Sequence, residues 1–276
     1  MSNSQPGSSD IFQQFRLDGR VAFITGAAGH LGQPMAAALA GAGAHVILNG
    51  RRREPLDALA AELTSRGQSA SIACFDITHH ESAQNYVSEI EKKYGRLDIL
   101  VNNASAGRPG TLETATITDF EGSYRINVTA AFDLMQNFLP LLKAAAKENV
   151  GGASVINISS MYGAVSPDPA IYGTSGANNP PYYGAAKAGL IQLTRYAACH
   201  LAQDRIRVNC ISPGPFPSAQ YLSRDSKFHD QLKRKNPMRR TGDPKELQGP
   251  LLFLASDASS YVTGINLPVD GGWTAW

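Results

Sequence analysis

Val21-Ala22-Phe23-Ile24-Thr25-Gly26-Ala27-Ala28-Gly29-His30-Leu31-Gly32 is the segment on which the fold depends. It begins with a short apolar run of strand length, and an Ala-rich pattern of helical period follows its last glycine. Glycines between a strand and a helix let the backbone turn tightly and approach a pyrophosphate, whose charge then faces the helix N-terminus. The segment predicts a dinucleotide-binding strand–turn–helix unit; the alternative is a tight turn without a ligand.

The expected cofactor contacts of this turn come from Gly26, Gly29 and Gly32, together with His30 and Leu31. His30 stands where a glycine is expected in such a turn. We expect its side chain to lie over the phosphates, because no second histidine lies at the spacing of a metal site.

Short apolar runs alternate with longer helical patterns along the rest of the chain, as is typical of a parallel sheet with crossover helices. The predicted strands are Val21–Thr25, His45–Asn49, Ser71–Asp76, Ile99–Asn102, Ser154–Ser159, Arg207–Ser212 and Ile265–Val269. The predicted helices are Gly32–Ala40, Pro55–Arg66, Ser82–Tyr94, Asp119–Lys147, Tyr183–Gln203 and Pro244–Ala255. We therefore expect one α/β domain over residues 15–276, a Rossmann-type doubly wound parallel sheet of about seven strands with helices on both faces.

Two stretches interrupt the alternation, at residues 161–182 and 215–240. The first is rich in proline and asparagine, and the second has a short helical pattern near Asp225–Lys235. Loops of this length in a compact domain are usually lids or walls of a site, so we expect both on the substrate side.

Composition fits an ordinary globular domain, since 43% of the 276 residues are hydrophobic and 17% are charged. The formal net charge of +2 gives no reason to expect nucleic acid or an anionic membrane as a partner. No apolar run approaches the roughly 18 residues of a membrane-spanning helix. The polar N-terminus has no signal-peptide core, so we expect a flexible tail over residues 1–14 and a cytoplasmic protein.

The three cysteines Cys74, Cys199 and Cys210 are widely spaced, and each lies in an apolar run. This pattern predicts buried thiols in a reducing compartment rather than a disulfide framework or a metal site. We expect no metal.

The tip of the second predicted strand, Leu48-Asn49-Gly50-Arg51-Arg52-Arg53, carries guanidinium groups and no carboxylate. A carboxylate at this tip would accept hydrogen bonds from the ribose hydroxyls of NAD, whereas a guanidinium pairs well with the 2′-phosphate of NADP. The tip therefore favours NADP(H), with Asn49 and Arg51 as contacts, over a solvated basic turn.

Tyr183 and Lys187 are four residues apart at the start of an Ala-rich helical pattern, so they share a helix face. A phenol is a poor proton carrier at neutral pH unless a neighbouring cation lowers its pKa. The pair is interpreted as a general acid/base tuned by a lysine. In isolation, an aromatic and a lysine on a solvated face would be the better explanation.

Taken together, these motifs resemble the short-chain dehydrogenase/reductase family, in its compact single-domain type, from Leu17 to Trp276. The glycine turn is close to the family's TGxxxGxG, with His30 for the middle glycine. The other matching positions are Asp76-Ile77, Asn102-Asn103-Ala104-Ser105, Asn127, Ser160, Tyr183 with Lys187, and Pro213-Gly214 followed by Ser218. Within the family, the chain looks most similar to gluconate 5-dehydrogenases and related sugar-acid or polyol oxidoreductases.

The resemblance implies hydride transfer between NADP(H) and an alcohol or ketone. Tyr183 would exchange the proton, Ser160 would polarise the substrate oxygen, Lys187 would lower the pKa of Tyr183, and Asn127 would hold a proton-relaying water. The implied cofactor contacts beyond those of the glycine turn and the strand tip are Asp76, Ile77, Asn103, Tyr183, Lys187, Pro213, Gly214 and Ser218.

The substrate remains open at this point. Basic residues crowd the second loop region and suit a sugar acid, but an exposed basic helix face explains them equally well. The set comprises Arg224, Lys227, Lys233, Arg234, Lys235, Arg239 and Arg240. Met161, Tyr162, Tyr172 and Tyr182 would either form an aromatic wall around a sugar or attach residues 161–182 to the domain. The alternatives are a 3-oxoacyl-thioester (acyl carrier protein) reductase and, in another class, a non-catalytic NADP(H)-binding redox sensor.

Two further features of the chain bear on specificity and assembly. Ser160 and Tyr183 lie 23 residues apart, more than is usual in the family, which places an insert beside the reacting oxygen. The predicted helices Asp119–Lys147 and Tyr183–Gln203 are apolar on more than one face, as expected of helices that also contact another subunit. The family resemblance implies a homotetramer, with a homodimer as the alternative.

Overall fold

A seven-stranded parallel sheet forms the centre of the computed structural model, which describes residues 10–173, 178–218 and 226–276. Its strands are β1 Val21–Ile24, β2 His45–Gly50, β3 Ser69–Cys74, β4 Ile99–Asn102, β5 Ala153–Ile158, β6 Ile206–Pro213 and β7 Asn266–Val269. The strand order is β3-β2-β1-β4-β5-β6-β7. The order reverses between β1 and β4, and ligands of such sheets bind where the strands end at this switch point.

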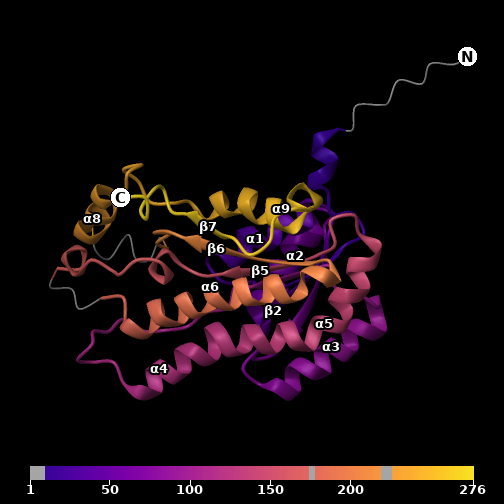
Figure 1. Cartoon of the computed structure of the whole chain (residues 1–276), viewed down its shortest axis with the longest axis horizontal. Coiled ribbons are helices and arrows are strands. Elements are labelled where there is room, and N and C mark those ends of the chain that lie inside the picture. Colours follow the sequence, from indigo (N-terminus) through magenta and orange to yellow (C-terminus); the bar gives the residue numbers. More distant parts are fainter. Residues whose placement is uncertain (1–9, 174–177, 219–225) are drawn as a thin grey trace, which may run out of the picture.

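Helices cover both faces of the sheet (Figure 1). They are α1 Gly32–Gly41, α2 Arg53–Ser65, α3 His80–Tyr94, α4 Ile117–Tyr124, α5 Ala130–Glu148, α6 Pro181–Leu201, α8 Ser226–Lys235 and α9 Gln248–Ala255. The pleat of β1 explains the two layers, because successive side chains point to opposite faces. Val21 and Phe23 lie in the core with α3, α5 and α6, whereas Ala22 and Ile24 lie in the core with α1, α2 and α9. The predicted single-domain Rossmann-type fold is confirmed.

The predicted continuous helix Asp119–Lys147 is interrupted. α4 begins two residues earlier, because Thr116 Oγ1 accepts the Asp119 N–H at 3.2 Å and the Asp119 carboxylate accepts the Thr116 N–H at 3.0 Å. Residues Arg125–Thr129 then form a π-helical turn before α5. Such turns are rare in proteins, and those that occur often lie at functional sites. This one contains Asn127.

The N-terminal segment is partly ordered, in contrast to the expected flexible tail over residues 1–14. Ile11–Phe15 form a 3₁₀ turn, because the Asp10 carboxylate accepts the Phe12 N–H at 3.0 Å. Residues 1–9 lie outside the described residues.

The expectation of three buried thiols was wrong for two of them. Cys210 on β6 is buried, Cys74 is half-buried at the end of an edge strand, and Cys199 is exposed. Cys199 lies on the solvent face of α6, whose opposite face carries the core residues. No helix in the described part of the chain combines the length and apolar character that a membrane span requires.

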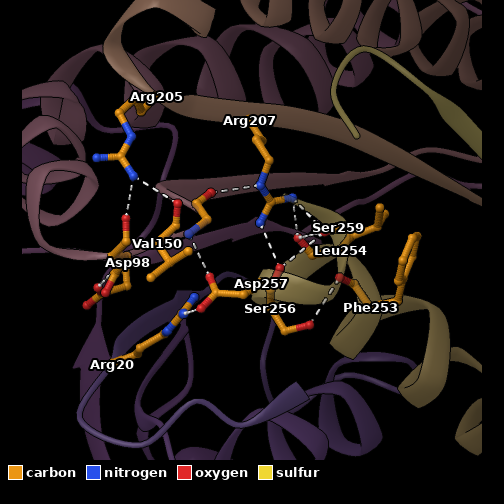
Figure 2. Close-up of polar contacts among 12 residues, drawn as sticks. Arg20, Asp98, Val150, Arg205, Arg207, Phe253, Leu254, Ser256, Asp257 and Ser259 are labelled. Atoms are coloured by element: carbon orange, nitrogen blue, oxygen red, sulfur yellow. Dashed lines mark hydrogen bonds and ion pairs between the residues drawn. The ribbon is translucent and has the colours of Figure 1, made fainter. Parts of the chain in front are cut away.

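At the start of β6, the buried Arg207 guanidinium joins the segment before β5 to the end of α9 and the segment after it (Figure 2). Arg207 donates to the carbonyls of Gly151, Leu254 and Ser256 at 3.1, 2.9 and 3.1 Å, and to Ser259 Oγ at 2.7 Å. Its neighbour Arg205 is exposed and donates to the carbonyls of Asn149 and Val150. Arg207 thus ties the segment after α9 to the sheet.

Candidate active site

The glycine turn after β1 is too tightly packed for side chains at its glycines. Gly26 has φ +63°, and a Cβ there would lie 3.1 Å from Ala104 Cα. A Cβ on Gly32 would lie 2.2 Å from the Gly26 carbonyl oxygen, closer than non-bonded heavy atoms can approach. The turn lies against a cavity of about 790 Å³ lined by Gly26, Gly29, His30, Leu31, Gly32, Asn49, Arg51, Arg52, Asp76, Ile77, Asn103 and Ser105, among others.

Asn103 and Thr25 hold this turn against the end of β4. Asn103 Nδ2 donates to the carbonyls of Thr25 and Gly26 at 2.9 and 3.2 Å. Thr25 Oγ1 accepts the N–H groups of Asn103 and Ala104, each at 2.9 Å. Asn103 therefore braces the turn from its side. The role of Thr25 was missed because a threonine after a strand carries no distinctive signal in the sequence.

The tip of β2 contributes to the same cavity. Asn49 is buried, and its Nδ2 donates to the carbonyls of Ala73 and Phe75, so this amide fastens β2 to the end of β3. Arg51 is largely exposed, and its guanidinium lies 3.9 Å from the Asp76 carboxylate. Ile77 is buried beside it.

Asp76 stays ionised at the mouth of this cavity. Burial opposes ionisation of its carboxyl group. Hydrogen bonds from Thr78 and the charge of Arg51 outweigh that effect, so the pKa of Asp76 is lowered. The carboxylate therefore offsets part of the positive charge of Arg51.

His30 reaches across the cavity to the loop that follows β6. Its Nε2 lies 3.1 Å from the carbonyl oxygen of Phe216, in the second of the expected substrate-side loops. The imidazole thus lies at the rim of the cavity and connects the glycine turn to this loop. That its side chain lies over the phosphates of a bound cofactor stays a prediction.

Ser160 and Tyr183 line a second cavity of about 720 Å³, which shares Ser105 with the first. Ser160 lies two residues after the end of strand β5, and its Oγ accepts the Tyr162 N–H at 3.2 Å. Tyr183 lies in the first turn of α6, which Pro180 and Pro181 start two residues before the predicted boundary. The two cavities therefore adjoin at Ser105, and Ser160 and Tyr183 line the second of them.

The expectation that Lys187 lowers the pKa of Tyr183 is not met in this structure. Burial raises the pKa of Tyr183, and a hydrogen bond with Ser160 opposes the increase. The Lys187 ammonium lies 5.6 Å from the centre of the Tyr183 ring and donates to the Ile158 carbonyl at 2.8 Å. The geometry thus couples Tyr183 to Ser160 more directly than to Lys187.

Lys187 is itself perturbed, because it is only 2% exposed. Burial lowers its pKa from 10.5 to about 8, although the neighbouring Cys210 thiol opposes the decrease. A lysine with such a pKa exchanges protons near neutral pH, as a proton relay requires.

The stability of the protein is expected to rise with pH relative to a Lys187→Met variant. Because the folded-state pKa of about 8 lies below the ordinary value of 10.5, the unfolded chain binds this proton more tightly. Below pH 8 the Lys187 ammonium is charged in both states, so the free-energy cost of burying its charge fully destabilises the folded protein. This cost is lost as the pH rises to 10.5, because the folded protein gives up the proton first. Urea unfolding at both ends of this window should show a relative gain on the order of 2–3 kcal/mol.

A Lys92→Met variant is the control for this titration, because Lys92 is exposed on α3. Its stability should follow that of the unmodified protein at every pH. Parallel pH profiles for the unmodified protein and Lys187→Met would contradict the prediction.

Asn127 lies buried in the π-helical turn, 2% exposed. Its Nδ2 donates to the Ser123 carbonyl at 2.9 Å, while its Oδ1 has no hydrogen-bond partner among the described residues. A buried acceptor without a partner is costly, so this oxygen is suited to a bound water or ligand group.

Described residues of both loop regions line the second cavity. It is lined by Ser105, Arg108, Met161, Tyr162, Tyr172, Asn178, Asn179, Pro180, Gly214, Pro215, Phe216, Pro217, Phe228 and Leu232, in addition to Ser160 and Tyr183. Tyr182 instead points away, donating its hydroxyl to the Arg108 carbonyl at 2.7 Å. Of the four residues proposed as an aromatic wall, Met161, Tyr162 and Tyr172 line the cavity and Tyr182 attaches the loop to the domain.

The end of β6 places Pro213 and Gly214 beside the junction of the two cavities, and Gly214 lines the second. Ser218 is half-buried and lines neither cavity. The sequence reading also missed Arg108, Asn178, Phe216 and Phe228, because only the packing of distant segments brings them here.

A model of the family described as enoyl-(acyl carrier protein) reductase matches residues 26–274, nearly the whole chain. The match extends from the first glycine of the turn through Tyr183 and Lys187. The chain belongs to the short-chain dehydrogenase/reductase family. The predicted family is thereby confirmed, and the protein is an oxidoreductase.

Similar short-chain dehydrogenases/reductases differ in substrate. The chain is 34% identical over 257 residues to a 3-oxoacyl-[acyl-carrier-protein] reductase of Thermotoga maritima, covering 93% of this chain and 98% of the relative. It is also 34% identical over 264 residues to a gluconate 5-dehydrogenase of Gluconobacter oxydans, covering 94% and 96%. One similar solved structure is a gluconate 5-dehydrogenase from Burkholderia cenocepacia in complex with NADP and tartrate. It superposes on this chain with a TM-score of 0.86 and 32% identity, and the match covers 97% of this chain and 100% of that chain.

Proposed function

We propose that this oxidoreductase uses NADP(H) to interconvert a secondary alcohol and a ketone. The observation that carries the proposal is a cavity lined by Ser160 and Tyr183 that adjoins the cavity of the glycine turn at Ser105, with the buried Lys187 ammonium over the tyrosine ring. When bound, the nicotinamide supplies or accepts the hydride at the substrate carbon. The chain's own residues would manage the charge and the proton on the substrate oxygen.

In the direction of ketone reduction, negative charge develops on the carbonyl oxygen and needs a hydrogen-bond donor and a proton. The Ser160 hydroxyl would hold this oxygen, and the Tyr183 hydroxyl would transfer its proton to it. Lys187, titrating near pH 8, would help to restore that proton. A water held by the unpartnered Asn127 Oδ1 would connect this path to solvent.

The first cavity fits a dinucleotide with a 2′-phosphate. The glycine turn lies against this cavity and is tight because side chains at Gly26 and Gly32 would clash with neighbouring backbone, and α1 begins directly after it, so its N-terminus would face a bound pyrophosphate. At the other end, the guanidinium groups of Arg51 and Arg52 line the cavity. The NADP complex of the Burkholderia cenocepacia relative supports the same choice.

Replacing Arg51 with aspartate is expected to shift cofactor preference from NADPH toward NADH. The change removes a phosphate partner and places a second carboxylate near Asp76, so it repels the 2′-phosphate and can accept hydrogen bonds from ribose hydroxyls. The ratio of kcat/KM for the two cofactors should fall by roughly 10–100-fold, since a charged hydrogen bond contributes about 1.5–3 kcal/mol.

Arg53→Asp is the matched control, because the Arg53 guanidinium pairs with Asp57 on the surface of α2. Arg53 is not among the residues that line the first cavity. This variant should keep the native preference. A native enzyme that prefers NADH would refute the assignment of NADP(H).

A sugar-acid or polyol substrate was expected because of the basic residues in the second loop region. Of these, none that the structure describes lines the second cavity. Arg224 lies outside the described residues. The Gluconobacter oxydans relative still supports a sugar acid, and the Thermotoga maritima relative supports a 3-oxoacyl thioester equally. A redox sensor would have no need to bring Ser160, Tyr183 and Lys187 together.

The proposed function is tested by following NADPH oxidation with a panel of ketones. 5-Ketogluconate, acetoacetyl thioesters and cyclic ketones represent the competing classes. Consumption of NADPH that depends on both the enzyme and one of these ketones supports the proposal, and no consumption with any carbonyl compound contradicts it.

The expected homotetramer also belongs to the proposal. Phe120, Tyr124, Phe132 and Tyr196 are large apolar side chains exposed on α4, α5 and α6. Contact with a second subunit would bury them. Sedimentation of a monomer at micromolar concentration would contradict an assembly of this kind.

A further inference from the structure

Building on the proposed function, we propose that the substrate is a hydroxy or keto compound with an apolar body of at least ring size next to the reacting carbon. The compound would carry no charged group where it contacts α8 and residues 161–172. An alicyclic ring and a medium-length acyl chain both satisfy this chemistry. The proposal rests on the walls of the second cavity.

Aromatic and aliphatic groups from two segments form one continuous apolar wall of this cavity. Met161, Tyr162 and Tyr172 come from the first loop region, and Phe228 and Leu232 come from α8. The Tyr172 and Phe228 rings stack with their centres 5.5 Å apart. An apolar substrate surface gains free energy from leaving water for such walls, whereas each hydroxyl of a polyol would need its own hydrogen-bond partner there.

The orientation of α8 excludes its charges from the cavity. Phe228 and Leu232 are one helical turn apart and share the face that lines it. Lys233 pairs with Asp230 at 2.7 Å on the surface of the helix. Lys235 pairs with Asp168 at 2.5 Å, outside the lining residues.

Arg108 is the one cation among the described lining residues, and it already has a partner. Its Nε and Nη2 donate to the two oxygens of the Asp119 carboxylate at 2.9 and 2.7 Å. A substrate carboxylate would have to compete with this bidentate pair or remain buried without a counter-ion, which is costly. Polar lining groups are otherwise neutral, such as Asn178 and Ser105.

The apolar walls are held together as one unit. The Lys235–Asp168 pair and the Tyr172–Phe228 stack both join α8 to residues 161–182. Leu232 is buried in a cluster with Ile171 and Trp273 behind the wall. The insert before Tyr183 therefore shapes the cavity together with α8, and neither does so alone.

The unmodified enzyme tests the proposal with NADPH and ketones of graded apolarity. Values of kcat/KM should increase by about tenfold or more from cyclohexanone to 4-tert-butylcyclohexanone, or from 3-oxobutanoyl to 3-oxooctanoyl N-acetylcysteamine thioester. Whichever series shows the increase identifies a ring or an acyl chain as the source of the apolar body. A kcat/KM for 5-ketogluconate equal to or above the best apolar ketone would overturn the proposal. NADPH consumption would still occur in that case, so the outcome is distinct from failure of the proposed function.

A Phe228→Ala variant should lower kcat/KM for the larger ketones by about tenfold or more and leave that for cyclohexanone and the KM for NADPH nearly unchanged. Phe228→Leu should retain most of the selectivity, because it keeps an apolar contact. Lys233→Ala, on the outer face of the same helix, is the matched control. An equal loss for every substrate in Phe228→Ala would show a general structural role and overturn the proposal.

Discussion

Tyr183→Phe is expected to abolish turnover while NADPH binding is nearly preserved. The change removes one hydroxyl and keeps the ring that contacts the Lys187 ammonium. Without that hydroxyl, the cavity loses its proton donor beside Ser160. Loss of general acid catalysis costs about 10²–10⁴-fold, so kcat should fall at least into this range. Steady-state kinetics and a fluorescence titration with NADPH measure the two quantities separately.

The adjacent tyrosine offers a matched control. Tyr182 is buried, and its hydroxyl donates to the Arg108 carbonyl outside the second cavity. Tyr182→Phe should therefore change kcat by less than about tenfold, since a neutral hydrogen bond contributes about 0.5–1.5 kcal/mol. If Tyr183→Phe kept activity comparable to Tyr182→Phe, the assignment of Tyr183 as the acid/base would be wrong.

Arg207→Met is expected to produce the largest loss of stability. Methionine fills much of the same space but leaves the carbonyls of Gly151, Leu254 and Ser256 without this donor. The Leu254 and Ser256 carbonyls keep serine hydroxyl donors, so in the described part of the chain the Gly151 carbonyl alone loses its side-chain partner. Such a buried group costs about 1–3 kcal/mol, and with the other charged hydrogen bonds also lost we expect a total loss of about 3–5 kcal/mol. Urea denaturation should show the loss directly, and Tm should fall by about 10 °C.

Arg205→Met is the control for this change, because Arg205 lies nearby and also donates to two carbonyls (Figure 2). It is exposed, so water can replace its hydrogen bonds and the loss should stay below about 1 kcal/mol. Equal losses in the two variants would show that burial of Arg207 does not set its contribution. Below its unfolding temperature, Arg207→Met should keep its affinity for NADPH, since β6 separates this cluster from the cofactor cavity.

The parts of the site that were predictable depend on residues close together in the chain. The glycine turn, the tip of β2 and the Tyr183–Lys187 spacing each determine local geometry, because a strand end or a helical turn positions neighbouring side chains in a known way. The strand boundaries were predictable to within two residues for the same reason. The parallel direction of the strands followed from the alternation of strands and helices, which restricts the possible crossover connections.

Properties that depend on burial were predicted less well. The expected effect of Lys187 on Tyr183 assumed that a cation near a phenol dominates its pKa. In the structure, the ammonium donates to the Ile158 carbonyl, and burial raises the pKa of Tyr183 instead. The sequence left open whether the basic residues near α8 face the substrate or the solvent, and in the structure Phe228 and Leu232 of this helix line the cavity instead.

The sequence by itself determined the family and the sheet and proposed the reacting side chains, since these follow from short-range patterns of glycine, apolar and polar residues. Only the tertiary structure decided which side chains of α8 and of residues 161–172 line the second cavity. That choice depends on contacts between segments more than fifty residues apart, such as Asp168 with Lys235 and Tyr172 with Phe228. Packing between distant segments also sets the burial that governs the pKa values of Tyr183 and Lys187, and no local pattern encodes it.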